Sequence, residues 1–475
     1  MKVASSTAAA VAASLLSLSS GVLAAALPRN FVVTKDMLEI SVLGGQTIKA
    51  SQVLNPGFRS VGRGPRALAK AYSKFGVQIS PELLLILEEL LAALGFTIAG
   101  TGAGTGTNGG NNGGGINANQ STSASQGMVA AVPQMFDSEY LAQVDIGTPP
   151  QTLMLDFDTG SSDLWVFSTE TPKTQANGQT LYNIAGSSTA RPLQGATWSI
   201  KYGDGSSSSG DVYLDTVSIG GVTVENQAVE SARQVSTSFT NDTASSGLLG
   251  LAMNSINQVK PTPQKTFFSN AIDNLAMPLF TANLKKDTAG NYNFGFIDTT
   301  EFTGDLSFVN ANVSQGFWQF EATGFAVGGI TGNGTAAGAG AADANPAIVS
   351  MPHQAIADTG TTLLMLPEAI VAAYYQQVPS AQNSPQFGGY VFDCDAALPD
   401  LTLAIGSYNA VVPGALINFA PADGLSVSTA STCFGGLQAV GGLPFAIYGD
   451  VFLKSQFVVF HGGNSQLGFA PKPFN

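Results

Sequence analysis

Histidine, cysteine and basic residues are all scarce in this sequence. The chain has 475 residues but two histidines, His353 and His461, and two cysteines. Neither histidine stands in an HExxH motif, no stretch reads GxSxG, and a Ser-His-Asp hydrolase is poorly supported. The 19 Lys and Arg face 32 Asp and Glu, and a net charge of −13 argues against nucleic-acid binding. Chemistry must therefore rest mostly on carboxylates and hydroxyls, and we expect neither a metal nor another cofactor.

Long apolar runs are lacking beyond the N-terminus, since Glu88 and Glu89 interrupt the run at 83–94. The first residues carry one charge, Lys2, before an Ala/Leu/Ser stretch that ends in small residues. This pattern predicts a secretory signal peptide over 1–24, and serines within the stretch argue against a membrane anchor. We expect a secreted, extracellular protein with no membrane partner; vacuolar delivery is the alternative.

Export to an oxidising space gives meaning to the even cysteine count. Cys394 and Cys433 would close a loop with 38 residues between them. A disulfide is therefore expected, and a metal site built on two cysteines is the weaker alternative.

Charge is distributed unevenly along the chain. Residues 28–126 hold eight basic and five acidic groups, 8 − 5 = +3, whereas residues 127–475 hold ten basic and 27 acidic groups, 10 − 27 = −17. The difference suggests a removable leader docked by charge complementarity; a basic surface domain is the alternative. A Gly-rich stretch from 100 to 115 and the polar stretch from 117 to 126 predict an exposed tether. The run at 83–94 predicts an amphipathic helix that packs on the body or on the leader.

The body shows short alternating runs punctuated by Gly, Asn, Asp and Ser. Examples of predicted strands are 141–146, 152–157, 212–219 and 457–460, and the better helical segments are 264–274 and 367–377. This pattern indicates a mainly antiparallel β protein with few short helices.

An internal sequence repeat divides the body into two parts. Phe157-Asp158-Thr159-Gly160-Ser161-Ser162 is matched, 358 − 158 = 200 residues later, by Ala357-Asp358-Thr359-Gly360-Thr361-Thr362. Each is followed by an apolar pair and a glycine, at 248–250 and 447–449. A distant repeat of this kind predicts two similar lobes that face one another.

Two Asp-Thr-Gly loops related by a two-fold axis would bring Asp158 and Asp358 together. Two carboxyls at hydrogen-bond distance cannot both ionise, so they share one proton. Such a pair can activate a water molecule and polarise a carbonyl, which hydrolyses an amide without a covalent intermediate. The logic follows a known example, the aspartic-protease dyad. Two unrelated turn aspartates are the structural alternative.

These motifs resemble those of the pepsin-like aspartic endopeptidases, most closely the fungal secreted branch typified by penicillopepsin and aspergillopepsin. The match includes 157–165, Tyr202-Gly203-Asp204, 358–362 and 447–452, and it extends over about 137–475. The resemblance implies a bilobal fold, two antiparallel β lobes with a central active-site cleft. The lobes would span 128–302 and 303–475.

The resemblance also implies roles for individual residues. Asp158 and Asp358 would be the catalytic pair, Tyr202, Gly203 and Asp204 would form a flap over bound peptide, and Asp204 could accept a lysine beside the scissile bond. The supporting residues would be Thr159, Gly160, Ser161, Thr359, Gly360, Thr361 and Trp165, with Thr362 near the substrate. The implied function is a secreted acid endopeptidase, monomeric, with a preference for large apolar residues.

The leader, expected over 25–127, resembles the prosegments of this family at 55–77. By that likeness Lys74 would insert its ammonium between the two aspartates and make the leader an intramolecular inhibitor. The 83–94 run, the tether and a Gly/Ala-rich insertion at 328–345 depart from the family pattern. Asn241, Asn312 and Asn333 fit the N-glycosylation acceptor pattern. A binding protein without catalysis and an adhesive surface protein are the competing classes.

Overall fold

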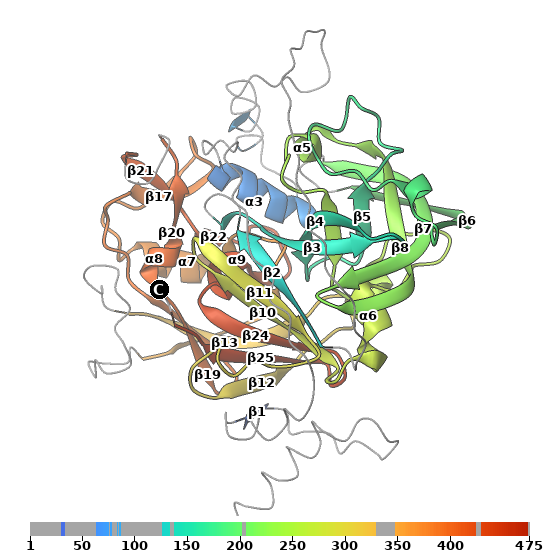
Figure 1. Cartoon of the computed structure of the whole chain (residues 1–475). Coiled ribbons are helices and arrows are strands. Elements are labelled where there is room, and N and C mark those ends of the chain that lie inside the picture. Colours follow the sequence, from blue (N-terminus) through green and yellow to red (C-terminus); the bar gives the residue numbers. More distant parts are fainter. Residues whose placement is uncertain are drawn as a thin grey trace, which may run out of the picture.

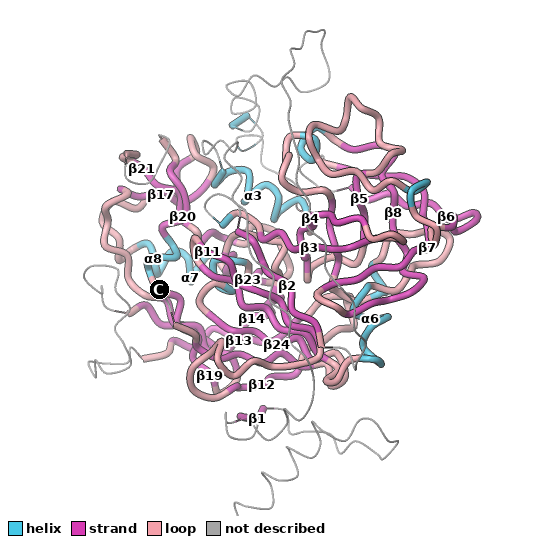
Figure 2. The backbone as a smooth tube through the Cα atoms, viewed as in Figure 1, coloured by secondary structure: helices cyan, strands magenta, loops and turns pink. Residues whose placement is uncertain are grey.

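The computed structural model of the chain describes residues 30–33, 63–75, 77, 83, 85–86, 126–133, 137–201, 206–328, 347–423 and 429–473. Strands dominate these residues, and the helices are short (Figure 2). The mainly β class is therefore confirmed. The signal peptide and the Gly-rich tether lie outside the described residues.

The largest sheet runs through the centre of the molecule and contains 14 strands in the order β1-β12-β25-β24-β10-β11-β2-β3-β4-β9-β5-β8-β7-β6. Its strands are β1 (Asn30–Val33), β2 (Gly127–Pro133), β3 (Tyr140–Ile146), β4 (Gln151–Asp158), β5 (Leu164–Phe167), β6 (Arg191–Lys201), β7 (Ser207–Ile219), β8 (Val222–Val235), β9 (Gly247–Gly250), β10 (Leu279–Lys285), β11 (Thr288–Phe294), β12 (Leu306–Asn310), β24 (Gln456–His461) and β25 (Gln466–Pro471).

Two smaller sheets form the rest of the C-terminal half. The seven-stranded sheet, in the order β19-β18-β13-β14-β23-β15-β22, contains β13 (Gln319–Val327), β14 (Val349–Ala357), β15 (Leu364–Leu366), β18 (Leu401–Ile405), β19 (Tyr408–Val412), β22 (Leu437–Ala439) and β23 (Ala446–Tyr448). The four-stranded sheet, in the order β16-β17-β21-β20, contains β16 (Gln382–Ser384), β17 (Gly389–Asp393), β20 (Asn418–Pro421) and β21 (Thr432–Gly435).

Short helices connect these strands. They are α3 (Arg63–Lys74), α5 (Thr237–Thr240), α6 (Phe267–Ala271), α7 (Glu368–Tyr375), α8 (Gly414–Ile417) and α9 (Asp450–Leu453), with 3-10 turns η2 (Ile184–Gly186), η3 (Asn254–Ile256) and η4 (Ile272–Asn274). Among the described residues, no helix is long and apolar enough to cross a membrane. The predicted strands and both predicted helical segments of the body are present, each within a few residues of its expected bounds.

The lobes lie on either side of helix α3. Strands β5 to β8 lie on one side, drawn in green, and strands β17, β20 and β21 lie on the other, drawn in orange (Figure 1). A continuous apolar core joins the two, and stacked aromatic rings of Phe280 in β10 and Phe460 in β24, 4.6 Å apart, form part of it. Burial of such rings is the main stabilising term for so large a sheet.

The internal sequence repeat corresponds to a repeat in the strand pairing. In the N-terminal lobe β4 pairs in parallel with β9, so that Asp158 lies opposite Gly250. In the C-terminal lobe β14 pairs in parallel with β23, and Ala357 lies opposite Tyr448. A third strand then pairs antiparallel with each, β5 with β9 and β15 with β23. The predicted duplication is thus a duplication of topology.

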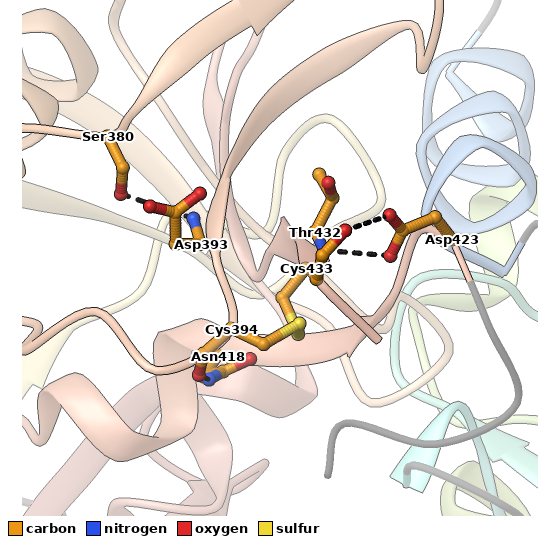
Figure 3. Close-up of a disulfide and its surroundings, with 8 residues drawn as sticks. Ser380, Asp393, Cys394, Asn418, Asp423, Thr432 and Cys433 are labelled. Atoms are coloured by element: carbon orange, nitrogen blue, oxygen red, sulfur yellow. Dashed lines mark hydrogen bonds between the residues drawn. A yellow bond between two sulfur atoms is a disulfide. The ribbon is translucent and has the colours of Figure 1, made fainter. Parts of the chain in front are cut away.

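The predicted disulfide between Cys394 and Cys433 is present, with an S–S distance of 2.02 Å (Figure 3). It ties the end of β17 to β21, and Asn418 donates a hydrogen bond from Nδ2 to the Cys394 carbonyl at 2.9 Å. Asp423 accepts a hydrogen bond from the Thr432 N–H on the other side of the bridge. The crosslink therefore ties together two strands of the four-stranded sheet, which we call the outer sheet of the C-terminal lobe.

Candidate active site

Each Asp-Thr-Gly loop follows the end of a buried strand. Asp158 is the last residue of β4 and is 1% exposed, and Asp358 follows β14 and is fully buried. Gly250 and Gly449 pack directly behind these loops. A Cβ atom at Gly250 would lie 2.5 Å from the Asp163 nitrogen, and one at Gly449 would lie 2.1 Å from the Thr361 oxygen. Because both neighbours are backbone, any larger side chain would push the loop away from the interface.

Threonine hydroxyls brace the two loops against each other. The N–H of Thr159 donates to Thr359 Oγ1 and the N–H of Thr359 donates to Thr159 Oγ1, both at 3.0 Å. Each hydroxyl in turn donates to the opposite strand, Thr159 to the Ala357 carbonyl at 2.8 Å and Thr359 to the Phe157 carbonyl at 2.5 Å. The contacts obey an approximate two-fold symmetry, and all four residues are buried. Such a network fixes the relative position of the two carboxyls.

The carboxyl groups themselves accept matching hydrogen bonds. These are Ser161 Oγ to Asp158 Oδ2 at 2.6 Å, Gly160 N to Asp158 Oδ1 at 2.8 Å, Thr361 Oγ1 to Asp358 Oδ2 at 2.6 Å and Gly360 N to Asp358 Oδ1 at 3.1 Å. In each loop, one oxygen is therefore held by a hydroxyl and the other by a backbone amide. The structure thus brings these six residues together, and their catalytic and supporting roles stay predictions.

The ammonium of Lys74 lies on the two carboxyls. Its Nζ is 2.5 Å from Asp158 Oδ1, 2.7 Å from Asp358 Oδ1 and 2.9 Å from Asp358 Oδ2. The Lys74 side chain is 4% exposed, so solvent hardly reaches the contact. A Cβ atom at Gly160 or Gly360 would lie within 2.8 Å of this nitrogen. The glycines of both motifs thus leave the room that the ammonium occupies.

Burial and the Lys74 charge act against each other on the two aspartates. Burial alone would raise the pKa of Asp158, but the Lys74 ammonium and its hydrogen bond outweigh this and hold the pKa below its ordinary value. For Asp358, burial dominates over the same ammonium, and the Asp158 charge adds to it, so the pKa is raised. With the ammonium in place, the two carboxyls therefore differ in their affinity for a proton.

Helix α3 brings a second lysine to the same area. Lys70 is one helical turn before Lys74, and its Nζ lies 3.4 Å from Asp156 Oδ2. Leu68 and Ala71 of the same helix are buried in an apolar cluster that includes Phe434 of the C-terminal lobe. The helix therefore presents charge to the aspartates and apolar side chains to the C-terminal lobe.

Sequence reasoning missed the carboxyls that surround Lys70. Asp156 is buried, and burial raises its pKa to about 6 although Lys70 opposes the shift. Burial also raises the pKa of Glu139, with the neighbouring charges of Asp242 and Asp156 adding to it. The available signal was the spacing of Lys70 and Lys74, four residues apart in a basic leader.

Several predicted site residues either lie outside the described residues or are not seen in contact with the two aspartates. Tyr202, Gly203, Asp204 and Asn333 lie outside the described residues. Trp165 is buried and packs against Phe167 and Trp198, and Phe239 lies edge-on to it at 4.9 Å. Its support of a flap tyrosine stays a prediction.

Thr362 and two predicted glycosylation sites are described. The Thr362 hydroxyl donates to the Ser138 carbonyl at 2.5 Å, which ties the C-terminal loop to the segment before β3. Asn312 is exposed and Asn241 is half-buried. The substrate and glycosylation roles of these residues stay predictions.

Residues 139–472 match the family described as Eukaryotic aspartyl protease, and the chain belongs to this family. It is 47% identical to endothiapepsin of Cryphonectria parasitica over 424 residues, which cover 89% of each protein. It is 50% identical to aspergillopepsin-1 of Aspergillus fumigatus (strain CBS 144.89 / FGSC A1163 / CEA10) over 351 residues, 74% of this chain and 82% of the relative.

Penicillopepsin-1 of Penicillium janthinellum is 48% identical over 350 residues, 74% of this chain and the whole of the relative. The fold is also that of the aspartic proteinase from Irpex lacteus, with a TM-score of 0.57, 20% identity and coverage of 74% of this chain and 98% of that one. The predicted class is confirmed: the protein is a pepsin-like aspartic endopeptidase.

Proposed function

We propose that Asp158 and Asp358 catalyse peptide-bond hydrolysis in acid once Lys74 has left. The observation that carries this proposal is the convergence of both carboxyls on one ammonium, within a two-fold network of Thr, Ser and Gly contacts. A water molecule can take the place of the ammonium because it can bond to the same oxygens.

In the proposed reaction, the ionised carboxyl removes a proton from this water while its oxygen attacks the carbonyl carbon of the peptide. The protonated carboxyl donates to the carbonyl oxygen, so that the tetrahedral intermediate carries no net oxyanion charge. The first carboxyl then gives its new proton to the amide nitrogen, and a hydroxyl of the intermediate gives a proton to the second carboxyl as the C–N bond breaks. The products are a carboxylic acid and an amine, and the pair regains its starting protonation state. The Thr159 and Thr359 contacts keep the carboxyls in place throughout.

The direct test is casein hydrolysis at about pH 3 to 4, where one carboxyl of such a pair is ionised and the other protonated. The Asp158→Asn variant should be inactive after the same acid treatment. Asp305→Asn is the matched control, because Asp305 is exposed and lies outside the site. Equal activity in parent and Asp158→Asn would refute the proposal.

We also propose that the leader makes the chain a zymogen, with its own prosegment as the inhibitor. Lys74 fills the water position, and Lys70 pairs with Asp156. Both ammonium groups favour the ionised form of the carboxyls they touch, so leader docking is strongest above the pKa values of those carboxyls and weakens as the pH falls through them. Acid would then release the leader, and cutting in the tether would give the mature enzyme.

The remaining parts of the proposal rest on the sequence and the family. We propose secretion to the extracellular space, a monomeric enzyme, protein and peptide substrates, and a preference for large apolar residues, with lysine also accepted beside the scissile bond. The boundaries 1–24, 25–127, 128–302 and 303–475 remain those expected from the sequence.

A further inference from the structure

The leader contacts the body through two kinds of interaction. Its lysines reach carboxyl groups, whereas its apolar side chains pack on the C-terminal lobe. Phe75, next to Lys74, lies edge-on to Phe317 and Phe445, with ring centroids 5.6 and 5.3 Å apart. The hydroxyl of Tyr72 donates to the Ala439 carbonyl at 2.9 Å. All of these contacts belong to α3 or to the residue that follows it.

The leader contacts the C-terminal lobe again further along the chain, in the same apolar cluster as α3. Leu83, Leu85 and Ile86 have helical backbone, and their burial differs sharply: Leu83 is 3% exposed and Leu85 is 59% exposed. Leu83 belongs to an apolar cluster that includes Val391 of β17 and Phe434 of β21. One face of this short helical stretch therefore lies on the outer sheet of the C-terminal lobe.

The turn between β16 and β17 receives this face. Gly388 in the turn has φ +71, and a Cβ atom built on it would lie 2.6 Å from Leu83 Cδ1 and 3.4 Å from Ile86 Cδ1. The three atoms nearest to that position all belong to Leu83 and Ile86. The space left by the missing side chain at Gly388 is therefore filled by the leader, through Leu83 and Ile86.

We propose that the β16–β17 turn around Gly388 is a second docking site for the leader, occupied by Leu83 and Ile86. The inference rests on the proposed role of the leader as an intramolecular inhibitor. Burial of leucine does not depend on protonation, unlike the pairing of Lys70 and Lys74 with carboxyls. The site therefore holds the leader on the C-terminal lobe in acid, while the lysines leave the catalytic pair.

The test compares full-length chains at a mildly acidic pH at which the parent converts slowly to active enzyme. Leu83→Ala should convert about tenfold faster, because the truncated side chain loses part of the buried apolar contact that holds the leader. Leu85→Ala is the matched control, since its side chain is exposed, and it should convert within about twofold of the parent. Equal rates for the two variants would overturn the proposal.

A second pair of variants addresses the body side of the contact. Gly388→Ala adds a methyl group against Leu83, and Gly178→Ala adds one at an exposed left-handed glycine, φ +95, with no atom within 4 Å. Both place alanine in the left-handed region, where a side chain strains the backbone. Only Gly388→Ala should speed conversion, and its fully converted enzyme should keep parental kcat/KM. In the Leu83→Ala background, Gly388→Ala should no longer change the rate of conversion. If it speeds conversion as much there as in the parent, the two residues are not in direct contact.

Lys74→Ala separates failure of this inference from failure of the proposed function. If Lys74→Ala converts no faster than the parent, the leader does not inhibit through the catalytic pair, and the proposed role of Lys74 in the zymogen fails. If Lys74→Ala is fast while Leu83→Ala and Leu85→Ala match the parent, the second docking site alone is refuted.

Discussion

At the scale of single residues, the site depends on how one ammonium and a few hydroxyls set the charge of two buried carboxyls. Lys74 holds Asp158 ionised, and without it the two carboxyls repel unless they bind a proton. The leader is therefore a competitor for the proton as well as for the water position. Changes at these residues should alter pH dependence more than they alter the fold.

Lys74→Met keeps the aliphatic stem and removes the charge. We expect this full-length variant to hydrolyse casein about tenfold faster than the parent at a mildly acidic pH where the parent is latent, because loss of one partner breaks a buried ion pair. Lys173→Met, at an exposed lysine, is the matched control. A Lys74→Met zymogen as latent as the parent would show that the leader inhibits by other contacts.

Ser161→Ala removes the hydroxyl that donates to Asp158 Oδ2. This hydrogen bond lowers the pKa of Asp158, so its loss should raise that pKa and move the acid limb of the kcat/KM profile to higher pH. Because the lost hydrogen bond is to a charged group, we expect kcat/KM to fall about tenfold. Ser161→Thr should restore the parental profile, since Thr361 makes the same contact in the second loop. An unchanged acid limb in Ser161→Ala would contradict this role.

At the scale of secondary-structure elements, strands β5 and β8 enclose a second pair of acidic groups that the catalytic site does not use. Glu230 in β8 and Asp163 just before β5 are each 1% exposed, and Asn257 Nδ2 donates to both, at 3.0 and 3.1 Å. Burial, with the Asp163 charge, raises the pKa of Glu230, and burial raises that of Asp163 to about 6. Such a pair is stable when it shares a proton.

Its effect on stability has a definite sign. The folded state binds the Glu230 proton more tightly than the unfolded state, so stability is full below the unfolded pKa and is lost as the pH rises toward the folded pKa. Glu230→Gln should therefore raise the thermal midpoint at neutral pH relative to the parent and change it little in acid. Glu225→Gln, at an exposed position of the same strand, is the control. Equal midpoints at neutral pH in all three proteins would refute this assignment.

The disulfide is the other element-scale determinant of stability. Removing it by Cys394→Ala with Cys433→Ala should lower the free energy of unfolding by about 3 to 4 kcal/mol, on the chain-entropy estimate for such a loop. Urea unfolding in acid measures this change. A loss below about 1 kcal/mol would mean that the Thr432 and Asn418 contacts around the bridge hold the outer sheet without it.

Local patterns predicted most of the elements and the catalytic loops, because alternation and Asp-Thr-Gly repeats are readable along the chain. They did not predict that Lys70 pairs with Asp156, because that contact joins residues 86 apart. Nor could they reveal the Glu230 and Asp163 pair, since an acidic residue in a strand normally faces solvent. Gly388 is another such case: only the folded chain brings Leu83 to it.

At the scale of the whole molecule, charge explains why leader and body belong together and why acid separates them. The body carries 10 − 27 = −17 and the leader 8 − 5 = +3. Protonation of carboxyls removes both the attraction to the leader and the self-repulsion of the body. The same charge distribution thus favours release and stability at low pH.

Above neutrality the mature body should inactivate, because its exposed carboxyls are ionised and repel one another. Salt screens exposed charges, and about 0.5 M NaCl shortens the Debye length to about 4 Å. Inactivation at about pH 8 should therefore be several-fold slower in this salt. The buried Glu230 and Asp163 pair is screened less, and Glu230→Gln should slow inactivation further in the same salt. Full activity after prolonged incubation at that pH without salt would contradict both effects.

The most direct test of the central claim is the turnover number of Asp158→Asn, Asp358→Asn and the double variant, measured on one peptide in acid after removal of the leader. Because the two carboxyls act as one unit, each single variant should lose at least about a thousandfold in kcat, and the double variant should lose no more than the worse single one. Retention of activity within tenfold of the parent by either single variant would show that hydrolysis does not depend on the pair.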